Sequence, residues 1–153
     1  MRKPAYQIYI CKDKRKLFVT YNIPTQSAMH EILLVEDDPL YAKILSYLLE
    51  NNGYLVDCAA DGLQGMEMVR KKKYDLVVTD ILMPFASGLD LLDDIRGNIA
   101  SRDTKVIVMS IMDGEFYVSE SLSRGADEYL QKPVTAKELL QSIRRHLYKA
   151  IAC

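Results

Sequence analysis

Short apolar runs alternate with stretches of helical periodicity from about residue 30 to the end of the chain, and this pattern constrains the fold most strongly. The clearest runs are Ile32-Leu-Leu-Val35, Leu76-Val-Val78 and Val106-Ile-Val-Met109, and weaker runs occupy 54–58 and 128–130. The clear runs do not alternate polar and apolar residues, which is typical of strands buried on both faces of a parallel sheet.

The segments between these runs have the spacing of amphipathic helices. In the last one, apolar residues recur at helical intervals opposite a polar face, and Thr135 with Glu138 forms a capping-box signal. Helices are therefore predicted over 39–51, 62–72, 87–97, 115–124 and 136–147. Five strands that alternate with five helices indicate an open, doubly wound α/β sandwich, which binds ligands beyond the carboxyl ends of its strands.

The start of the chain differs in composition from the rest. Residues 1–29 hold six basic residues and one acid, whereas the remainder holds 14 basic and 20 acidic residues and all seven glycines. We therefore predict a basic N-terminal extension over 1–28 and a domain over 29–150. In the extension, Tyr6–Ile10 and Leu17–Tyr21 flank a polar connector, which predicts a β-hairpin.

Charge and cysteine content argue against several classes of protein. The net charge of −1 gives no field that attracts nucleic acid or an anionic membrane. No apolar run approaches the ~18 residues of a membrane span. Three widely spaced cysteines and two histidines disfavour a disulfide scaffold and a zinc site, and favour a reducing compartment. We expect a cytoplasmic protein with no direct contact to nucleic acid or membrane.

Four of the five predicted strands end in polar or charged side chains. Glu36 and Asp37 follow the first run, and Asp80, Ser110 and Lys132 follow the third, fourth and fifth. These ends converge on one edge of a parallel sheet. Crowded carboxylates repel one another unless a cation relieves them, and Mg²⁺ takes carboxylate and phosphate oxygens. The sequence predicts a Mg²⁺ (or Mn²⁺) site where an ammonium and a hydroxyl can contact a phosphoryl group.

At this point the sequence resembles the receiver domains of two-component response regulators, over about residues 29–149. The motifs that carry the resemblance are Val35-Glu-Asp-Asp-Pro39, Asp80-Ile-Leu-Met-Pro84 with Gly88-Leu89, Ser110, Gly125-Ala-Asp-Glu-Tyr129 and Lys132-Pro133. The resemblance implies a flavodoxin-like fold, that is, a five-stranded parallel sheet of order 2-1-3-4-5. Here it would carry the N-terminal β-hairpin-like extension.

The resemblance also implies a role for each site residue. Asp80 is the expected phosphoacceptor, and Lys132 is expected to pair with the phosphoryl group. Ser110 and Tyr129 are the expected switch residues, which move once the phosphoryl group is attached. The expected metal ligands are Glu36 (through a water), Asp37, Asp80 and the backbone carbonyl of Leu82.

The implied function is that of a phosphoacceptor in a two-component system or phosphorelay. A histidine kinase or a histidine phosphotransfer protein would donate the phosphoryl group, and phosphorylation would switch the binding of a downstream protein or of an output domain outside this chain. Such a domain is no enzyme, since it promotes only its own phosphotransfer and slow dephosphorylation. The predicted hairpin carries apolar residues that could pack on a second copy of the chain, so a homodimer is one alternative.

Departures from the family pattern keep a second hypothesis open. The residue after the switch hydroxyl is commonly small, but here it is the bulky Ile111. A pseudo-receiver, which binds partners without being phosphorylated, is therefore the alternative. Leu82 and Met112 stand where polar residues of faster-hydrolysing relatives orient water, which predicts a long-lived aspartyl phosphate. A hydrolase with an aspartate nucleophile is disfavoured, because it usually has a second acid at the position of Leu82.

Overall fold

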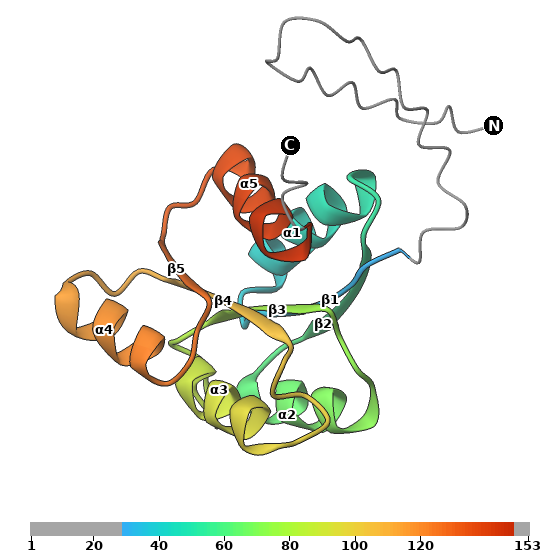
Figure 1. The fold of residues 1–153 in the computed structure, drawn as a ribbon. Coiled ribbons are helices and arrows are strands. Elements are labelled where there is room, and N and C mark those ends of the chain that lie inside the picture. Colours follow the sequence, from blue (N-terminus) through green and yellow to red (C-terminus); the bar gives the residue numbers. More distant parts are fainter. Residues whose placement is uncertain (1–28, 149–153) are drawn as a thin grey trace, which may run out of the picture. The chain divides into compact units, whose positions relative to one another are not determined.

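The computed structural model describes residues 29–148, so the predicted hairpin of the extension lies outside the described residues. Strands and helices alternate strictly along these residues (Figure 1). The elements are β1 (Glu31–Val35), α1 (Pro39–Asn51), β2 (Leu55–Ala59), α2 (Gly62–Lys71), β3 (Leu76–Asp80), α3 (Gly88–Gly97), β4 (Lys105–Ser110), α4 (Glu115–Ser123), β5 (Glu128–Gln131) and α5 (Ala136–Leu147).

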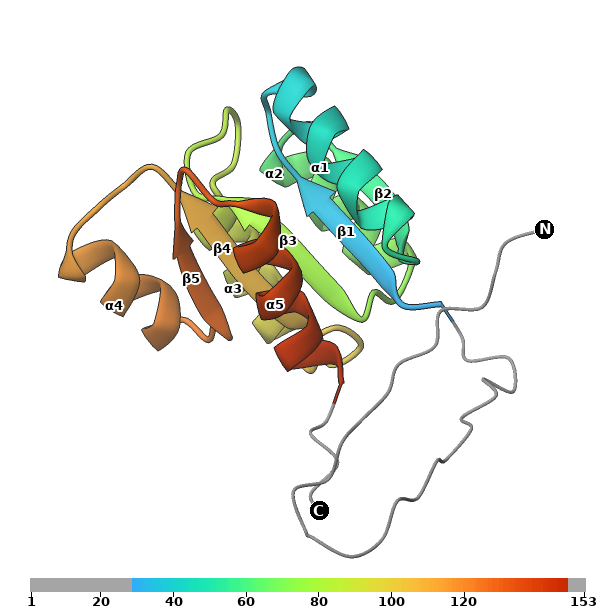
Figure 2. The ribbon, with the colours of Figure 1, turned by 90° about the horizontal axis from the view of Figure 1, so that it is seen from above.

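All five strands form one parallel sheet of order β2-β1-β3-β4-β5, which confirms the predicted fold class. Helices α1 and α5 cover one face of the sheet, and α2 and α3 cover the other (Figure 2). Because the chain order reverses between β1 and β3, the carboxyl ends of these two strands flank the topological switch point where such sheets bind ligands.

The unbroken apolar runs are buried on both faces of the sheet. Along β1, Ile32 and Leu34 pack in the core beneath α1 and α5, whereas Leu33 and Val35 pack in the core beneath α2 and α3. This explains why the runs lack polar alternation. Beyond its apolar run, β3 continues through the buried residues Thr79 and Asp80, so Asp80 ends the strand as predicted.

Local capping fixes where the helices begin. The carboxylate of Asp38 accepts hydrogen bonds from the backbone N–H groups of Leu40 and Tyr41, and Pro39 occupies the first helical position of α1. The predicted capping box of Thr135 and Glu138 opens α5. None of the helices within residues 29–148 has the length and apolarity needed to cross a membrane.

Candidate functional site

Three carboxylates meet at the carboxyl edge of the sheet. Glu36 and Asp37 directly follow β1, and Asp80 ends the neighbouring strand β3. One carboxylate oxygen of each residue lies within 4.8 Å of the others. Glu36 and Asp80 are buried, whereas Asp37 is exposed. The structure thus brings together the three predicted metal-binding carboxylates, whose role as ligands stays a prediction.

Lys132, one residue beyond β5, reaches into this cluster. Its Nζ donates hydrogen bonds to Glu36 Oε2 at 2.7 Å and to Asp80 Oδ2 at 2.5 Å, and its side chain is only 12% exposed. Burial works to lower the pKa of the Lys132 ammonium, but the hydrogen bonds that it donates to Asp80 and Glu36 outweigh burial and leave the pKa above its usual value. Lys132 is therefore held as a cation between two buried carboxylates.

Burial dominates at Glu36 and raises the pKa of its carboxyl group, against the opposing effects of Lys132 and of the Asp38 backbone N–H. A buried carboxylate with a raised pKa is stabilised by an additional cation. In octahedral Mg²⁺ coordination, ligand oxygens ~2.1 Å from the ion lie at most about 4.2 Å apart. Three oxygens within 4.8 Å of one another come close to this spacing. The donor set therefore fits a small, hard divalent ion.

The two carboxylate oxygens of Asp80 have different partners. Oδ2 accepts from Lys132, and Oδ1 accepts from the backbone N–H of Leu82 at 3.0 Å. The predicted contribution of the Leu82 carbonyl to a metal site stays a prediction.

A glycine allows α3 to begin directly against Asp80. The N–H of Gly88 donates to the carbonyl of Ile81 at 3.1 Å, and a Cβ at position 88 would lie 1.9 Å from the carbonyl oxygen of Asp80. No side chain fits in that space, since the nearest obstacle is the backbone carbonyl of Asp80. The close packing of α3 against the end of β3 thus explains why a glycine occupies position 88 of the receiver-like motif.

The two predicted switch residues both contact the backbone of Met112. Ser110 ends β4 and is fully buried, and its hydroxyl accepts from the Met112 N–H at 3.3 Å. The hydroxyl of Tyr129, on the adjacent strand β5, donates to the Met112 carbonyl. Burial raises the pKa of the Tyr129 phenol. Whether these residues move on phosphorylation stays a prediction.

A hollow of about 430 Å³ opens beside the acidic edge. It is lined by Glu36, Asp38, Tyr41, Ile111, Lys132, Pro133 and Val134. Ile111 is 65% exposed, so it stands at the rim of the hollow and is not packed into the core.

Sequence analysis missed Tyr41. Its ring lies over the ammonium of Lys132, with 4.7 Å between Nζ and the ring centroid. The available signal was the N-cap at Asp38, which places residue 41 in the first turn of α1, at the same end of the sheet as the acidic residues.

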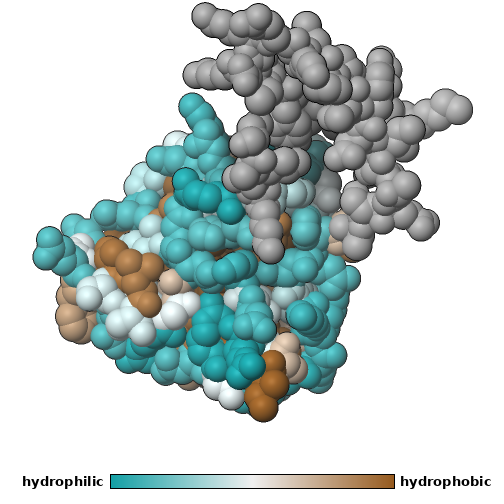
Figure 3. All heavy atoms as spheres, in the orientation of Figure 1, coloured by the Kyte–Doolittle hydropathy of each residue, from teal (hydrophilic) through white to brown (hydrophobic). Residues whose placement is uncertain are grey.

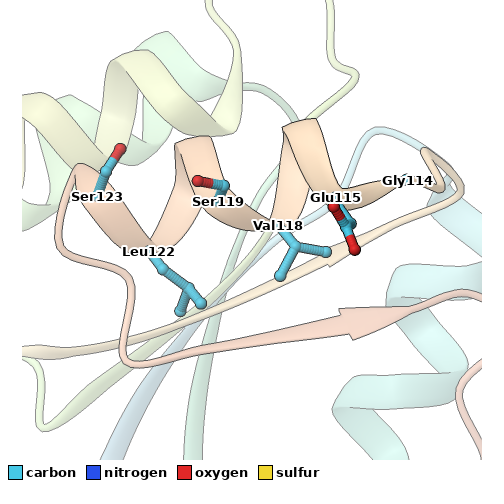
Figure 4. A pocket seen from close by; sticks show the side chains of 6 residues that line it. All are labelled: Gly114, Glu115, Val118, Ser119, Leu122 and Ser123. Carbon is cyan, nitrogen blue, oxygen red and sulfur yellow. The ribbon is translucent and has the colours of Figure 1, made fainter.

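A second hollow, of about 740 Å³, lies along the length of α4 (Figure 4). Its lining residues are Gly114, Glu115, Val118, Ser119, Leu122 and Ser123. Val118 and Leu122 project from one side of α4 and the two serines from the other (Figure 4). An apolar patch also lies over α4 on the face in Figure 3, where most of the surface is hydrophilic. Glu115 is the one ionisable residue in this lining, so the hollow has neither the clustered carboxylates nor the ammonium of the acidic edge.

The sheet order and the acidic edge at the β1–β3 switch point define a flavodoxin-like α/β domain. More particularly, residues 32–144 match the family model of the response regulator receiver domain, and the chain belongs to this family. The transcriptional regulatory protein DltR of Streptococcus agalactiae is 39% identical over 113 residues, which are 74% of this chain and 50% of the relative. The chain therefore spans about half the length of the curated relatives it matches.

Solved receiver structures have the same fold. Chemotaxis protein CheY4 of Vibrio cholerae superposes with a TM-score of 0.75 at 27% identity, over 78% of this chain and all of that chain. The receiver domain of the sensor histidine kinase PA1611 of Pseudomonas aeruginosa gives a TM-score of 0.71 at 30% identity, over 78% of this chain and 98% of that chain. That structure contains a magnesium ion in its active-site cleft.

Proposed function

We propose that this receiver domain accepts a phosphoryl group on Asp80 in a two-component system or phosphorelay. The observation that carries the proposal is the position of Lys132, whose ammonium bridges Asp80 and Glu36 beside the exposed Asp37. Such an arrangement concentrates positive charge where a phosphoryl group would be attached, next to a carboxylate that can act as the nucleophile.

The reaction forms one bond and breaks one. An oxygen of the Asp80 carboxylate attacks the phosphorus of a phosphohistidine and forms an O–P bond with its own electron pair. The P–N bond breaks, and its electron pair remains on the imidazole, which keeps or takes up a proton. Lys132 already donates to the Asp80 carboxylate, so its ammonium would be placed to stabilise the charge of the transferred phosphoryl oxygens. The backbone N–H of Leu82 holds the carboxylate in place through Oδ1.

Glu36, Asp37, Asp80 and the Leu82 carbonyl are the groups that would hold Mg²⁺ or Mn²⁺. The bound ion would supply neutralisation of negative charge on the phosphoryl oxygens. The magnesium ion in the cleft of the PA1611 receiver supports this assignment.

Phosphorylation would act on the loop after β4. A group with a charge near −2 at Asp80 attracts the hydroxyl of Ser110, which now accepts from the Met112 N–H. Movement of Ser110 and Met112 would remove the carbonyl partner of the Tyr129 hydroxyl. Ser110, Met112 and Tyr129 therefore form one contact network that can take two arrangements, which a switch requires.

The relatives indicate the kind of partner. One is part of a hybrid signal transduction histidine kinase of Dictyostelium discoideum, and others are transcriptional regulators about twice the matched length. We propose that a histidine kinase or histidine phosphotransfer protein donates the phosphoryl group. A downstream protein, or an output domain outside this chain, would read the phosphorylated state.

The test is intact-mass measurement of the protein with Mg²⁺ and a small phosphodonor. We expect one phosphoryl adduct in the wild-type protein and none in Asp80→Asn. An adduct of equal yield in Asp80→Asn would refute Asp80 as the acceptor. The alternative, a pseudo-receiver, is favoured by the bulky rim residue Ile111. It predicts no adduct in the wild-type protein, even in the presence of a histidine phosphotransfer protein.

A further inference from the structure

An aromatic ring forms one wall of the site at Lys132. Tyr41 lies in the first turn of α1, and its own backbone N–H donates to the Asp38 carboxylate at 3.0 Å. The cap that starts the helix thus also fixes the place of the ring. The side chain is partly buried, packs against the core beneath α1 and α5, and lines the hollow beside the acidic edge.

The ring contacts the same cation that the two carboxylates hold. Glu36 and Asp80 accept two of the three N–H groups of the Lys132 ammonium, at 2.7 and 2.5 Å. The Tyr41 ring centroid lies 4.7 Å from the same nitrogen, within the range of a cation–π interaction. Lys132 is only 12% exposed, and such contacts strengthen when the cation is desolvated.

The carboxylate contacts of Lys132 change in the proposed reaction, but the aromatic contact does not. When Asp80 becomes an acyl phosphate, its carboxylate charge is lost and Lys132 must turn to a phosphoryl oxygen. Glu36 is at the same time a proposed partner of the divalent ion. The Tyr41 ring takes part in neither event, so it can hold Nζ at the edge of the sheet throughout.

We propose that Tyr41 is a positioning residue for phosphotransfer, which keeps the Lys132 ammonium beside Asp80 while the carboxylate contacts are exchanged. This inference rests on the proposed phosphoacceptor function. A purely structural role predicts that any side chain of similar volume and apolarity at position 41 serves equally well. Tyr41→Phe keeps the ring and removes only the hydroxyl, and Tyr41→Leu keeps an apolar side chain and removes the ring.

The first measurement needs no phosphorylation. In the apo protein, ring current shifts the Lys132 Cε protons upfield when they lie over an aromatic face. We expect the upfield shift in the wild-type protein and in Tyr41→Phe, and its loss in Tyr41→Leu. An unshifted Lys132 signal in the wild-type protein would overturn the proposed contact.

The second measurement is the rate of phosphorylation by a small phosphodonor, with Mg²⁺ affinity and the unfolding midpoint measured in parallel. We expect Tyr41→Leu to lower the maximal rate about fivefold or more, whereas Tyr41→Phe keeps the wild-type rate. Mg²⁺ affinity should stay unchanged in both variants, because Tyr41 offers the ion no ligand in this arrangement.

Each remaining outcome is decisive. If Tyr41→Leu is phosphorylated at the wild-type rate, or if both variants lose rate in proportion to lost stability, Tyr41 is a packing residue and the inference is wrong. If the wild-type protein is not phosphorylated at all, the proposed function fails, and the Lys132 chemical shift still reports whether the ring holds the cation.

Discussion

The Nζ atom of Lys132 lies 2.5 Å from Oδ2 of Asp80, although the two residues are 52 positions apart in the sequence. The contact exists because β3 and β5 both end at the same edge of the sheet, on either side of β4. Lys132 also binds Glu36, so in the described structure one ammonium pairs with two buried carboxylates and leaves part of their charge uncompensated.

Replacing this ammonium should make the fold more dependent on divalent cations. In Lys132→Met, Glu36 and Asp80 stay buried without their cation, which costs about 3–5 kcal/mol of unfolding free energy. Mg²⁺ would recover part of this loss. We expect the melting temperature of Lys132→Met to rise more steeply with Mg²⁺ concentration than that of the wild-type protein.

Thermal melts of both proteins with and without Mg²⁺ measure this effect. Lys137→Met is a matched control, because Lys137 lies on exposed α5 surface near the same end of the sheet. Equal Mg²⁺ responses in the Lys132 variant and the wild-type protein would show that the ion does not compensate for the missing ammonium.

A second prediction concerns Gly88, where α3 meets the end of β3. An added Cβ would lie 1.9 Å from the Asp80 carbonyl oxygen, so Gly88→Ala must displace backbone and should cost about 1–3 kcal/mol or more. Gly97, in the same helix, has no heavy atom near the position of an added Cβ. Gly97→Ala should therefore be neutral or stabilising by up to about 1 kcal/mol. Urea unfolding of the two variants separates them, and equal effects would contradict the close packing at Gly88.

A third prediction follows from the carboxylate of Glu128, which ties β5 to α5. It accepts from Ser142 at 2.6 Å, from Arg145 at 2.6 Å and from His146 Nε2 at 2.7 Å. Burial works to raise the pKa of Glu128, but these three partners outweigh it and leave the pKa below its ordinary value of 4.5. Because the folded-state pKa is depressed, the stabilisation is fully present above about pH 4.5 and is lost as the pH falls through the folded-state value.

Glu128→Gln should therefore be less stable than the wild-type protein at pH 7, by about 1–3 kcal/mol. The difference should shrink as the pH falls below 4.5, where the wild-type carboxylate is protonated too. Glu67→Gln is the control, because the one ion pair of Glu67 within residues 29–148 is an exposed pair with Lys71. A stability difference for Glu128→Gln that does not vary with pH would exclude the charge of Glu128 as its cause.

The sequence predicted the fold well because its strongest signals are local and agree with one another. The runs at 32–35, 76–78 and 106–109 are apolar throughout since both faces of β1, β3 and β4 are covered by helices. Adjacent parallel strands must end at a common edge, so the polar residues after each run could be placed together without a structure.

Contacts that depend on side-chain direction could not be predicted in this way. The distance between Tyr41 and Lys132 depends on the exact start of α1 at Asp38 and on where the chain turns after β5. Likewise, no local pattern indicates that Ser110 and Tyr129 share Met112 as a partner, because the loop after β4 has no periodicity. The bulk of Ile111 was evident, but its place at the rim follows only from the path of that loop.

A fourth prediction tests the proposed domain boundary. The described residues 29–148 contain both cores of the sheet, so a protein lacking residues 1–28 should fold on its own. We expect the truncated protein to unfold cooperatively with the wild-type melting temperature. Light scattering of both proteins tests whether the extension mediates a homodimer. A truncated protein that does not fold would place the boundary elsewhere.

The last prediction concerns the lifetime of the phosphorylated protein, and it rests on the proposed function. An aspartyl phosphate is lost when a water molecule attacks the phosphorus, and a side chain that hydrogen-bonds this water accelerates the step. Leu82 stands two positions after Asp80, and Met112 stands two positions after Ser110; neither side chain offers such a group. Ile111 adds apolar bulk at the rim of the hollow beside the acidic edge. Each ~1.4 kcal/mol added to the barrier slows hydrolysis about tenfold. We expect phosphorylated Asp80 to persist for many minutes or longer, and Met112→Glu or Leu82→Asn to shorten its lifetime.

Ile99→Asn, an exposed substitution in the loop between α3 and β4, is the control and should leave the lifetime unchanged. The measurement is decay of the phosphorylated mass after removal of the donor. A wild-type half-life of seconds, or polar variants that decay more slowly, would show that these apolar side chains do not protect the phosphoryl group.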